Sequence, residues 1–287
     1  MRPPLSVRSA TLAEALAFAR SAPLVSPHFV ARALGSLCRG DDARWAVADA
    51  DGLRLVGVIL DTCDSRDDVA ELLPVGGALD LDEDTLGALL AHAEAVAAAG
   101  PRTNLDITVD ADRARWVGPL VARGYQPAYQ MSSLRREPTP VDEPVVAGLT
   151  WEPVTPATAA ELWSLVGAAF ADLPGAMRAP LDEFVAHVAA ATPAPELLLR
   201  DGRAIGFVRV GGTPTGAEVR SLGVHPAARG GLGEVVLRRA LAACLTLAPA
   251  EITLDVATTN TRALSLYLRN GFVPTAETTT WRRGLPR

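Results

Sequence analysis

The stretch Glu218–Gly233, EVRSLGVHPAARGGLG, decides how the second half of this chain folds. It begins as a β-strand and passes through a glycine-rich turn into Leu232–Leu247, whose apolar spacing predicts a helix. Such a unit points several backbone N–H groups and the positive end of a helix at one place. Glycines let a phosphate approach the backbone and tolerate positive φ angles. The stretch therefore predicts a pyrophosphate site, to which Arg229 adds a charged donor.

Regular elements continue from this turn in both directions. The predicted strands are Leu149–Val154, Glu196–Arg200, Ala204–Val210, Glu218–Val224, Ile252–Ala257 and Val273–Arg283. The predicted helices are Pro156–Phe170 with Thr155 as its cap, Leu181–Ala191, Leu232–Leu247 and Thr261–Asn270. This order predicts an α/β (or α+β) fold in which a mixed, mostly antiparallel sheet is flanked by helices.

The same order of elements occurs twice along the chain. A constant shift of 147 residues places Ala70-Glu71 on Ala217-Glu218, Ile107 on Leu254, Gly124-Tyr125 on Gly271-Phe272, and Arg135-Arg136 on Arg282-Arg283. A register held over this length predicts two related domains. We expect them at residues 1–136 and 148–287, joined by a proline-rich and acidic linker at 137–147.

Two blocks of the second half resemble the GCN5-related N-acetyltransferase (GNAT) superfamily. The coenzyme A loop of that family reads Gln/Arg-x-x-Gly-x-Gly/Ala, and Gly231-Leu232-Gly233 matches its Gly-x-Gly. Ala228 stands where the family has Gln or Arg, and Arg229 comes one residue late, so the loop is one residue shorter than the common form. The block Leu254–Phe272 resembles the motif that comes next along the chain in that family. This motif consists of a strand, an Asn and then a helix that carries Ala and Leu-Tyr and ends at Gly-Phe.

The resemblance implies an acyl-coenzyme A co-substrate, no metal, and a role for each matching residue. The backbone of Leu222, Gly223 and Val224 would hold the pantetheine arm and polarise the thioester carbonyl. The pyrophosphate would lie against the turn residues Arg229, Gly230, Gly231, Leu232, Gly233 and Glu234. Asn260 would contact the cofactor near the pantetheine. Tyr267 would protonate the departing thiolate; without the motif it reads as a half-buried aromatic on an amphipathic helix.

Three further side chains have both a chemical and a structural interpretation. Glu218 begins the strand where some family members place a general base, but it is also a strand-end glutamate that Glu71 matches in the first half. His225 precedes Pro226 in the turn and is interpreted as structural. Cys244 lies within the following helix, and direct acyl transfer needs no cysteine nucleophile.

The first half lacks the residues that the chemistry requires. Asp82-Glu83-Asp84 stands where the second half has its cofactor turn, and Asp82–Ala98 is instead predicted to be a helix with an acidic first turn. Each carboxylate at about 4 Å from a phosphate would cost about 1 kcal/mol even in water. Leu120 takes the place of Tyr267, and Arg113 that of Asn260. The first half is therefore interpreted as a degenerate GNAT-like domain.

Composition narrows the class of function. Apolar residues make up 49% of the 287 residues, and no apolar run is long enough to span a membrane. A net charge of −6 argues against general nucleic-acid binding, and the three separated cysteines define neither a disulfide framework nor a metal cluster. The start of the chain lacks the apolar core of a signal peptide, so a cytoplasmic location is expected.

The leading hypothesis is an enzyme that transfers an acetyl group from acetyl-CoA to a primary amine of a small molecule. Transfer would occur by direct attack in a ternary complex. One alternative is a non-catalytic acyl-CoA-binding or sensor module, which the shortened turn favours. Another is acetylation of a cysteinyl amino sugar, as in mycothiol synthase, a tandem member of the family. The acceptor is expected to be selected by the loop Phe170–Pro180 and the cleft between the halves, which carry no readable motif.

Overall fold

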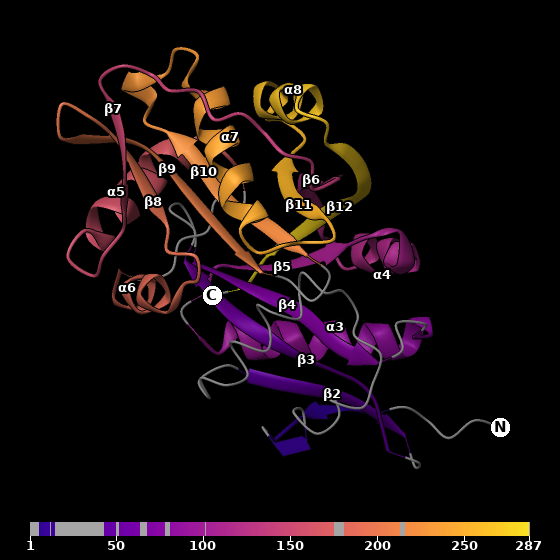
Figure 1. Cartoon of the computed structure of the whole chain (residues 1–287). Helices are drawn as coiled ribbons and strands as arrows, with labels where there is room; N and C mark the ends of the chain where they lie inside the picture. The colour runs from indigo at the N-terminus through magenta and orange to yellow at the C-terminus, as the bar shows by residue number, and fades with distance from the viewer. Residues whose placement is uncertain are drawn as a thin grey trace. The chain divides into compact units, whose positions relative to one another are not determined.

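The chain forms two compact units of strands and helices, and its twelve described strands are ordered in one sheet (Figure 1). The computed structural model describes residues 6–11, 13–14, 43–49, 52–63, 68–77, 81–100, 102–174, 181–212 and 216–286. Unit 1 consists of Met1–Tyr129 with Thr278–Arg287, and unit 2 of Gln130–Glu277. The two helices expected early in the first half, and the end of the expected acceptor loop, lie outside the described residues. The predicted α/β class is confirmed.

Unit 2 is a mixed sheet covered by helices on both faces. Its strands lie in the order β6 (Gln126–Arg136), β11 (Ile252–Ala257), β10 (Ala217–Val224), β9 (Arg203–Gly212), β8 (Glu196–Arg200) and β7 (Leu149–Pro153). Its helices are α5 (Ala159–Phe170), α6 (Leu181–Ala190), α7 (Leu232–Leu245) and α8 (Thr261–Arg269). Phe207 packs with α5 and α6, whereas its neighbour Val208 packs with α7. Since successive strand residues point to opposite faces, the two helix pairs cover opposite sides.

Unit 1 has the same strand order. Its strands lie in the order β1 (Ser6–Ser9), β2 (Ala43–Asp49), β3 (Gly52–Cys63), β4 (Asp68–Gly77), β5 (Asn104–Val109) and the end of β12 (Val273–Gly284). Helix α3 (Glu83–Ala98) buries Leu86, Leu89 and Leu90 in the core of this unit. The Asp82 carboxylate accepts a hydrogen bond from the Thr85 backbone N–H at 2.8 Å. The helix predicted from the acidic stretch is therefore confirmed, with Asp82 as its N-cap.

The strand pairing confirms the internal repeat. The parallel pair β4–β5 sets Ala70 opposite Leu105, and the parallel pair β10–β11 sets Ala217 opposite Ile252. Both partners of the second pair lie 147 residues after those of the first. The glycines that end the equivalent helices also agree, with φ of 83° at Gly124 and 84° at Gly271.

The two halves of the sequence exchange their last strands. β6 pairs with β11 and sets Arg136 opposite Ile252, whereas β12 pairs with β5 and sets Arg283 opposite Leu105. Each unit therefore takes a strand from the other half of the sequence, which the expected domain boundaries did not include. The two strands have equivalent positions in the repeat and the same Arg-Arg ending. The side-chain pattern of either strand is therefore compatible with pairing to β5 or to β11.

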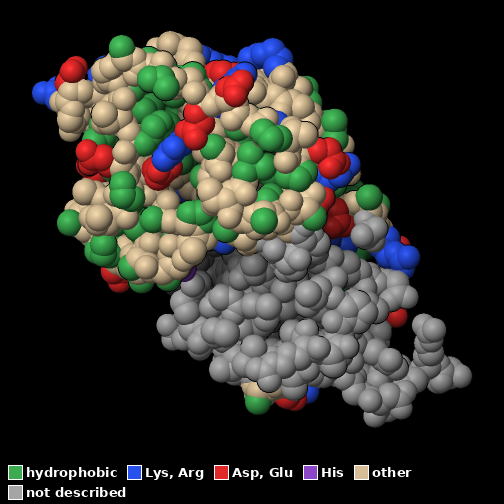
Figure 2. Space-filling model, in the orientation of Figure 1, with side chains coloured by type: hydrophobic (Ala, Val, Ile, Leu, Met, Phe, Trp, Pro, Cys, Tyr) green, Lys and Arg blue, Asp and Glu red, His purple; other side chains and the backbone are tan. Residues whose placement is uncertain are grey.

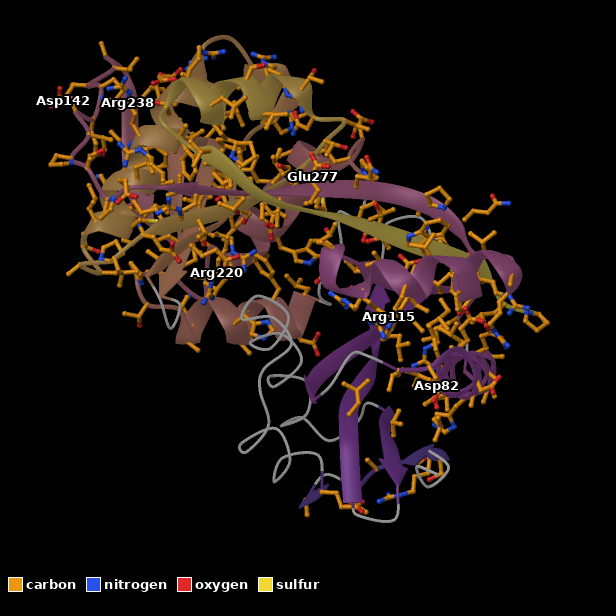
Figure 3. All side chains as sticks on the ribbon, turned by 90° about the vertical axis from the view of Figure 1, so that its right-hand side faces the viewer. Asp82, Arg115, Asp142, Arg220, Arg238 and Glu277 are labelled. Atoms are coloured by element: carbon orange, nitrogen blue, oxygen red, sulfur yellow. The ribbon has the colours of Figure 1, made fainter. Side chains whose placement is uncertain are left out.

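The segment 137–147, expected to be a linker, packs against α7. Arg238 donates a hydrogen bond to the Asp142 carbonyl oxygen at 3.2 Å, and both residues are labelled in Figure 3. Arg239 forms an ion pair with Glu143 at 2.9 Å, and Val141 packs against the core of unit 2. This segment is thus attached to unit 2 along part of its length.

A cluster around Glu94 attaches the exchanged strand β12 to unit 1. The Glu94 carboxylate accepts hydrogen bonds from Arg123 at 2.9 and 2.7 Å, and lies 2.7 Å from the guanidinium of Arg283 on β12. Tyr125 donates a further hydrogen bond to it at 3.2 Å. Burial alone would raise the pKa of Glu94, but Arg123 and then Arg283 hold it below the usual value.

We expect Glu94→Gln to lower the free energy of unfolding by about 1–3 kcal/mol at pH 7, because two partly buried arginines lose their anion. A lowered pKa means that this stabilisation is present above the usual carboxyl pKa and is lost as the pH falls through the folded-state value. Urea unfolding at pH 7 and pH 3 would measure the effect, which should shrink at pH 3. Glu137→Gln, in an exposed pair with Arg135, is the control and should change stability by less than about 0.5 kcal/mol. Equal losses in the two variants would contradict the prediction.

Candidate functional site

The site begins where two parallel strands separate. In the described sheet, β10 and β11 pair at two positions only, Ala217 with Ile252 and Glu218 with Thr253, although β10 continues to Val224. Its pairing with β9 also shifts register between Val219 and Ser221. The edge of β10 beyond Glu218 therefore faces an opening, where its backbone groups are not used by β11.

The glycine-rich turn presents the N-terminus of α7 to this opening. Gly230 and Gly231 have φ of 154° and 82°, and an added Cβ at either would meet nothing within 4 Å. Gly231 is the N-cap of α7 and has no side chain to bond the first N–H groups of the helix. Those groups and the helix dipole are therefore directed at the open space beside the two glycines. At Gly233 the Cβ position is 3.3 Å from Leu266, so α7 and α8 approach closely there.

A cavity of about 480 Å³ occupies this opening beside β10. It is lined by the end of α5, the end of β10, the glycine-rich turn and one face of α8. Most of the residues predicted to bind the cofactor line it, namely Leu222, Gly223, Val224, Arg229, Gly230, Gly231, Gly233, Glu234 and Asn260. Tyr267 lines it as well. Leu232 instead points into the core of unit 2, so only its backbone can face the cavity.

The cavity wall carries several arginines. Arg229 from the turn is joined there by Arg262 and Arg269 of α8. Sequence reasoning missed these last two as site residues. They are seven positions apart, which puts them on one face of a helix two turns apart, and this spacing was the signal that could have found them.

Acidic side chains at the wall are partly neutralised. The Glu234 carboxylate accepts hydrogen bonds from Arg238 at 2.8 Å and from Asn270 at 3.0 Å. Burial acts to raise its pKa, but these partners keep the pKa below its usual value. On the face of unit 2 drawn in Figure 2, acidic and basic side chains are interspersed. The cavity lining also carries both signs, since Asp172 and Glu234 line it together with the three arginines.

Tyr267 is the buried aromatic of α8. Its side chain is 8% exposed, and its ring packs edge-to-face on Phe272 with centroids 5.9 Å apart. Burial raises the pKa of Tyr267 to about 12. The hydroxyl therefore remains protonated at neutral pH, as a proton donor must.

Asn260 is the N-cap of α8. Its side-chain oxygen accepts a hydrogen bond from the Ala263 backbone N–H at 3.2 Å. The cap fixes the carboxamide at the wall of the cavity, and its amide nitrogen has no hydrogen bond within the described structure. Asn260 thus has a structural role that also leaves a donor at the cavity.

Three residues discussed from the sequence lie outside the cavity wall. Glu218 is four positions before Leu222 on β10, and its carboxylate lies 4.0 Å from the guanidinium of Arg220. The His225 side chain accepts a hydrogen bond from the Ala227 N–H at 3.2 Å and caps a short 3₁₀ turn, in line with its structural interpretation. Burial raises the pKa of the Cys244 thiol to about 12, which keeps it unreactive.

In unit 1 the corresponding place is filled with side chains. Trp116 stands at the position equivalent to Ala263 and is 0% exposed. Arg113, equivalent to Asn260, is 1% exposed and forms an ion pair with Asp110 at 2.7 Å. Leu120, equivalent to Tyr267, is fully buried in the same core. Bulky side chains thus occupy the space that Ala263 and Asn260 leave open in unit 2.

Neither a metal site nor a membrane-spanning helix is found in the described residues. No group of three or more His, Cys, Asp and Glu side chains within the described ranges has an arrangement that could hold a metal ion. Among the helices that the structure describes, none combines the length and apolar character needed to cross a bilayer.

Comparison with known proteins identifies the second half of the chain and its fold. Residues 163–272 match the model of the acetyltransferase (GNAT) family. The GCN5-related N-acetyltransferase from Sphaerobacter thermophilus aligns with a TM-score of 0.73 and 16% identity, over 99% of this chain and 96% of that one. A tandem GNAT protein from the clavulanic acid biosynthesis pathway aligns with a TM-score of 0.68 and 18% identity, over 99% of both chains. No curated protein sequence matches this chain.

Proposed function

Because residues 163–272 match the model of the acetyltransferase (GNAT) family, we propose that this chain transfers an acetyl group from acetyl-CoA to a primary amine of a small molecule. The observation that carries the proposal is the cavity between β10 and α8. It combines uncapped N–H groups of a helix, three arginines and a buried, protonated tyrosine. These are the groups that an anionic cofactor and a thiolate leaving group require.

The residues of the cavity fit coenzyme A. The pyrophosphate would lie against the backbone of Gly230–Gly233, where the missing Cβ atoms leave the N–H groups accessible. Arg229, Arg262 and Arg269 would add charge-assisted hydrogen bonds to the phosphates. The free amide nitrogen of Asn260 would donate to a carbonyl of the pantetheine arm. We assign no direct contact to the Glu234 carboxylate, because Arg238 and Asn270 already engage it.

In the proposed reaction the amine nitrogen forms a bond to the thioester carbonyl carbon, and the carbon–sulfur bond then breaks. The bound thioester supplies this activated carbon. Backbone N–H groups of Leu222–Val224 stabilise the negative charge that develops on the carbonyl oxygen. Tyr267 gives its proton to the leaving sulfur. An ammonium acceptor loses one proton to a base before it attacks, and the nitrogen loses a second proton once the new bond has formed. Through solvent, this second proton restores the Tyr267 hydroxyl, so that the proton transfers balance.

Glu218 is proposed as the base that receives the proton of the ammonium acceptor through water. It lies four positions before Leu222 on β10, a distance of about 10–13 Å, which rules out direct contact with an amine at the thioester. Its carboxylate lies 4.0 Å from the guanidinium of Arg220. A chain of water molecules along the open edge of β10 would connect the two positions.

Acetyl-CoA is expected to bind at one site per chain, in unit 2. Trp116 and Arg113 fill the equivalent place in unit 1, and Asp82 to Asp84 carry negative charge at the start of α3. Isothermal titration calorimetry of the whole chain should therefore give a stoichiometry near one. A stoichiometry of two would contradict the proposal that only unit 2 binds acetyl-CoA.

Turnover is tested by measuring thiol release from acetyl-CoA in the presence of a panel of small primary amines. Release that depends on an amine, with formation of the N-acetylated product, is the expected result. Thermal stabilisation by acetyl-CoA without turnover on any amine would instead favour an acyl-CoA-binding or sensor module. If acetyl-CoA neither stabilised the chain nor was turned over, the result would contradict both functions.

A further inference from the structure

A largely buried arginine of β9 lies outside the cavity lining and is not used by the proposed chemistry. Arg209 of β9 points to the α5–α6 face of the sheet, where its guanidinium lies 5.0 Å from the centre of the Phe184 ring. It makes no hydrogen bond or close ion pair with any residue in the described part of the chain. Burial and then the charge of Arg220 lower the pKa of Arg209, and Glu218 acts in the opposite direction. An arginine in this position has unused hydrogen-bond donors.

A second unpartnered polar group lies beside it. Ser221 of β10 is the cross-strand partner of Arg209, so both side chains are on the same face of the sheet. The Ser221 Oγ is buried, and no partner for it is found among the described residues. Buried hydroxyl groups rarely lack a hydrogen bond unless a water molecule or a ligand supplies it.

These two groups lie close to the point of acyl transfer. Gly223 lines the cavity two residues after Ser221, a distance of about 7 Å along the strand. An added Cβ at Gly223 would be 3.0 Å from Ala169 of α5, so Gly223 faces the same side of the sheet as Arg209 and Ser221. A small molecule with one end at the thioester position would have to extend about 7 Å past Gly223 to reach Ser221 and Arg209 with the other.

The charge of the group favours an anion. Arg209 and Arg220 carry two positive charges, and the Glu218 carboxylate lies 4.0 Å from Arg220 and acts on Arg209 from farther away. The geometry points to an acceptor that carries an oxyanion, a carboxylate or a phosphate, several bonds from its amine. Arg209 would bind this oxyanion through two parallel N–H donors, and Ser221 would add a hydroxyl. This inference rests on the proposed function and names the substrate class of the same site.

The experiment compares acceptors that differ only in this charge. The pairs are 4-aminobutyrate with 4-aminobutanamide, and phosphoethanolamine with ethanolamine, each assayed for acetyl-CoA-dependent thiol release. The whole chain is expected to prefer the anionic member by about 100-fold in kcat/KM. The pair with the larger preference tells whether the carboxylate or the phosphate is recognised.

Variants then assign the preference to Arg209. Arg209→Met keeps the aliphatic stem on Phe184 and is expected to reduce the preference to about 3-fold or less, with acetyl-CoA affinity unchanged. Arg209→Lys should restore part of the preference, and Ser221→Ala should lower it about 5-fold. Arg203→Met, at an exposed arginine of the same strand, is the matched control and should change nothing.

Stability separates recognition from a structural role. Because Arg209→Met removes a buried charge that lacks a close anion, its Tm should be unchanged or higher. A lower Tm with an unchanged charge preference would overturn the inference and make Arg209 structural. Equal turnover of charged and neutral amines by the natural chain would overturn it as well, while leaving acyl transfer intact. Absence of both acetyl-CoA binding and turnover would instead refute the proposed function, and the inference with it.

Discussion

Replacing Tyr267 by phenylalanine is expected to lower kcat by about 10²–10⁴-fold, with little change in the affinity for acetyl-CoA. Phenylalanine keeps the packing against Phe272 and removes only the hydroxyl, so the thiolate would leave without a proton donor. Steady-state kinetics with a fixed amine measure the loss in kcat. Calorimetric titration with acetyl-CoA measures binding separately.

The pH profile gives a second readout of the same residue. Burial raises the pKa of Tyr267 to about 12, so its hydroxyl remains protonated across the range in which the protein can be assayed. We therefore expect Tyr267 to impose no loss of kcat as the pH rises to about 10, and the defect of Tyr267→Phe to be similar at each pH. A defect that disappears at high pH would contradict its role as acid.

Tyr125→Phe is the matched control for this substitution. Tyr125 is also a buried tyrosine and precedes β6, but its hydroxyl bonds Glu94 in unit 1. Its loss should lower stability modestly and leave kcat unchanged. If both variants lost kcat equally, the effect would be a general consequence of removing a buried hydroxyl, and Tyr267 would not be the acid.

Gly231→Ala is expected to weaken coenzyme A binding by about 10–100-fold. A Cβ at this position points into the space beside the first N–H groups of α7, where a pyrophosphate would contact the backbone. The substitution also places alanine at a φ of 82°, which costs about 1–2 kcal/mol of stability. Calorimetry with coenzyme A and thermal unfolding measure the two effects.

Unit 1 offers a control with the same backbone strain. Gly124 has a φ of 83°, and a Cβ there likewise meets nothing within 4 Å, but it is far along the chain from the cavity lining. Gly124→Ala should therefore reduce stability about as much as Gly231→Ala and leave coenzyme A binding intact. Loss of binding in both variants would show that strain alone accounts for the result.

Much of the fold was predictable because the signals are local. The strands Glu196–Arg200 and Ile252–Ala257 have their predicted bounds. Helix α5 begins later than predicted, at Ala159 with Thr158 as its N-cap residue, because the residues after Thr155 form a turn first. Such end effects depend on a few competing hydrogen bonds, here from the Thr155 N–H to the Thr158 hydroxyl at 3.0 Å.

The candidate site was predictable in its turn and less so in its surroundings. Positive φ angles at Gly230 and Gly231, and the burial of Tyr267 at the cavity, follow the pattern of the sequence. Glu218 does not reach the cavity, because it lies four positions before Leu222, the first residue of β10 that lines it, and a strand extends about 3.3 Å per residue. The arginines Arg262 and Arg269 join the wall only when α8 packs beside α7.

By itself, the sequence determined the local geometry: a strand that turns at two glycines into a helix, an acidic helix start in place of that turn in the first half, and a repeat of 147 residues. Tertiary structure alone decided which unit received β6 and which received β12, how Trp116 fills the space left open at Ala263, and that Arg209 lies opposite Ser221. The reason is physical. Backbone conformation depends on neighbours along the chain, whereas strand pairing and the filling of space depend on residues that are distant in sequence and, in a repeat, nearly interchangeable.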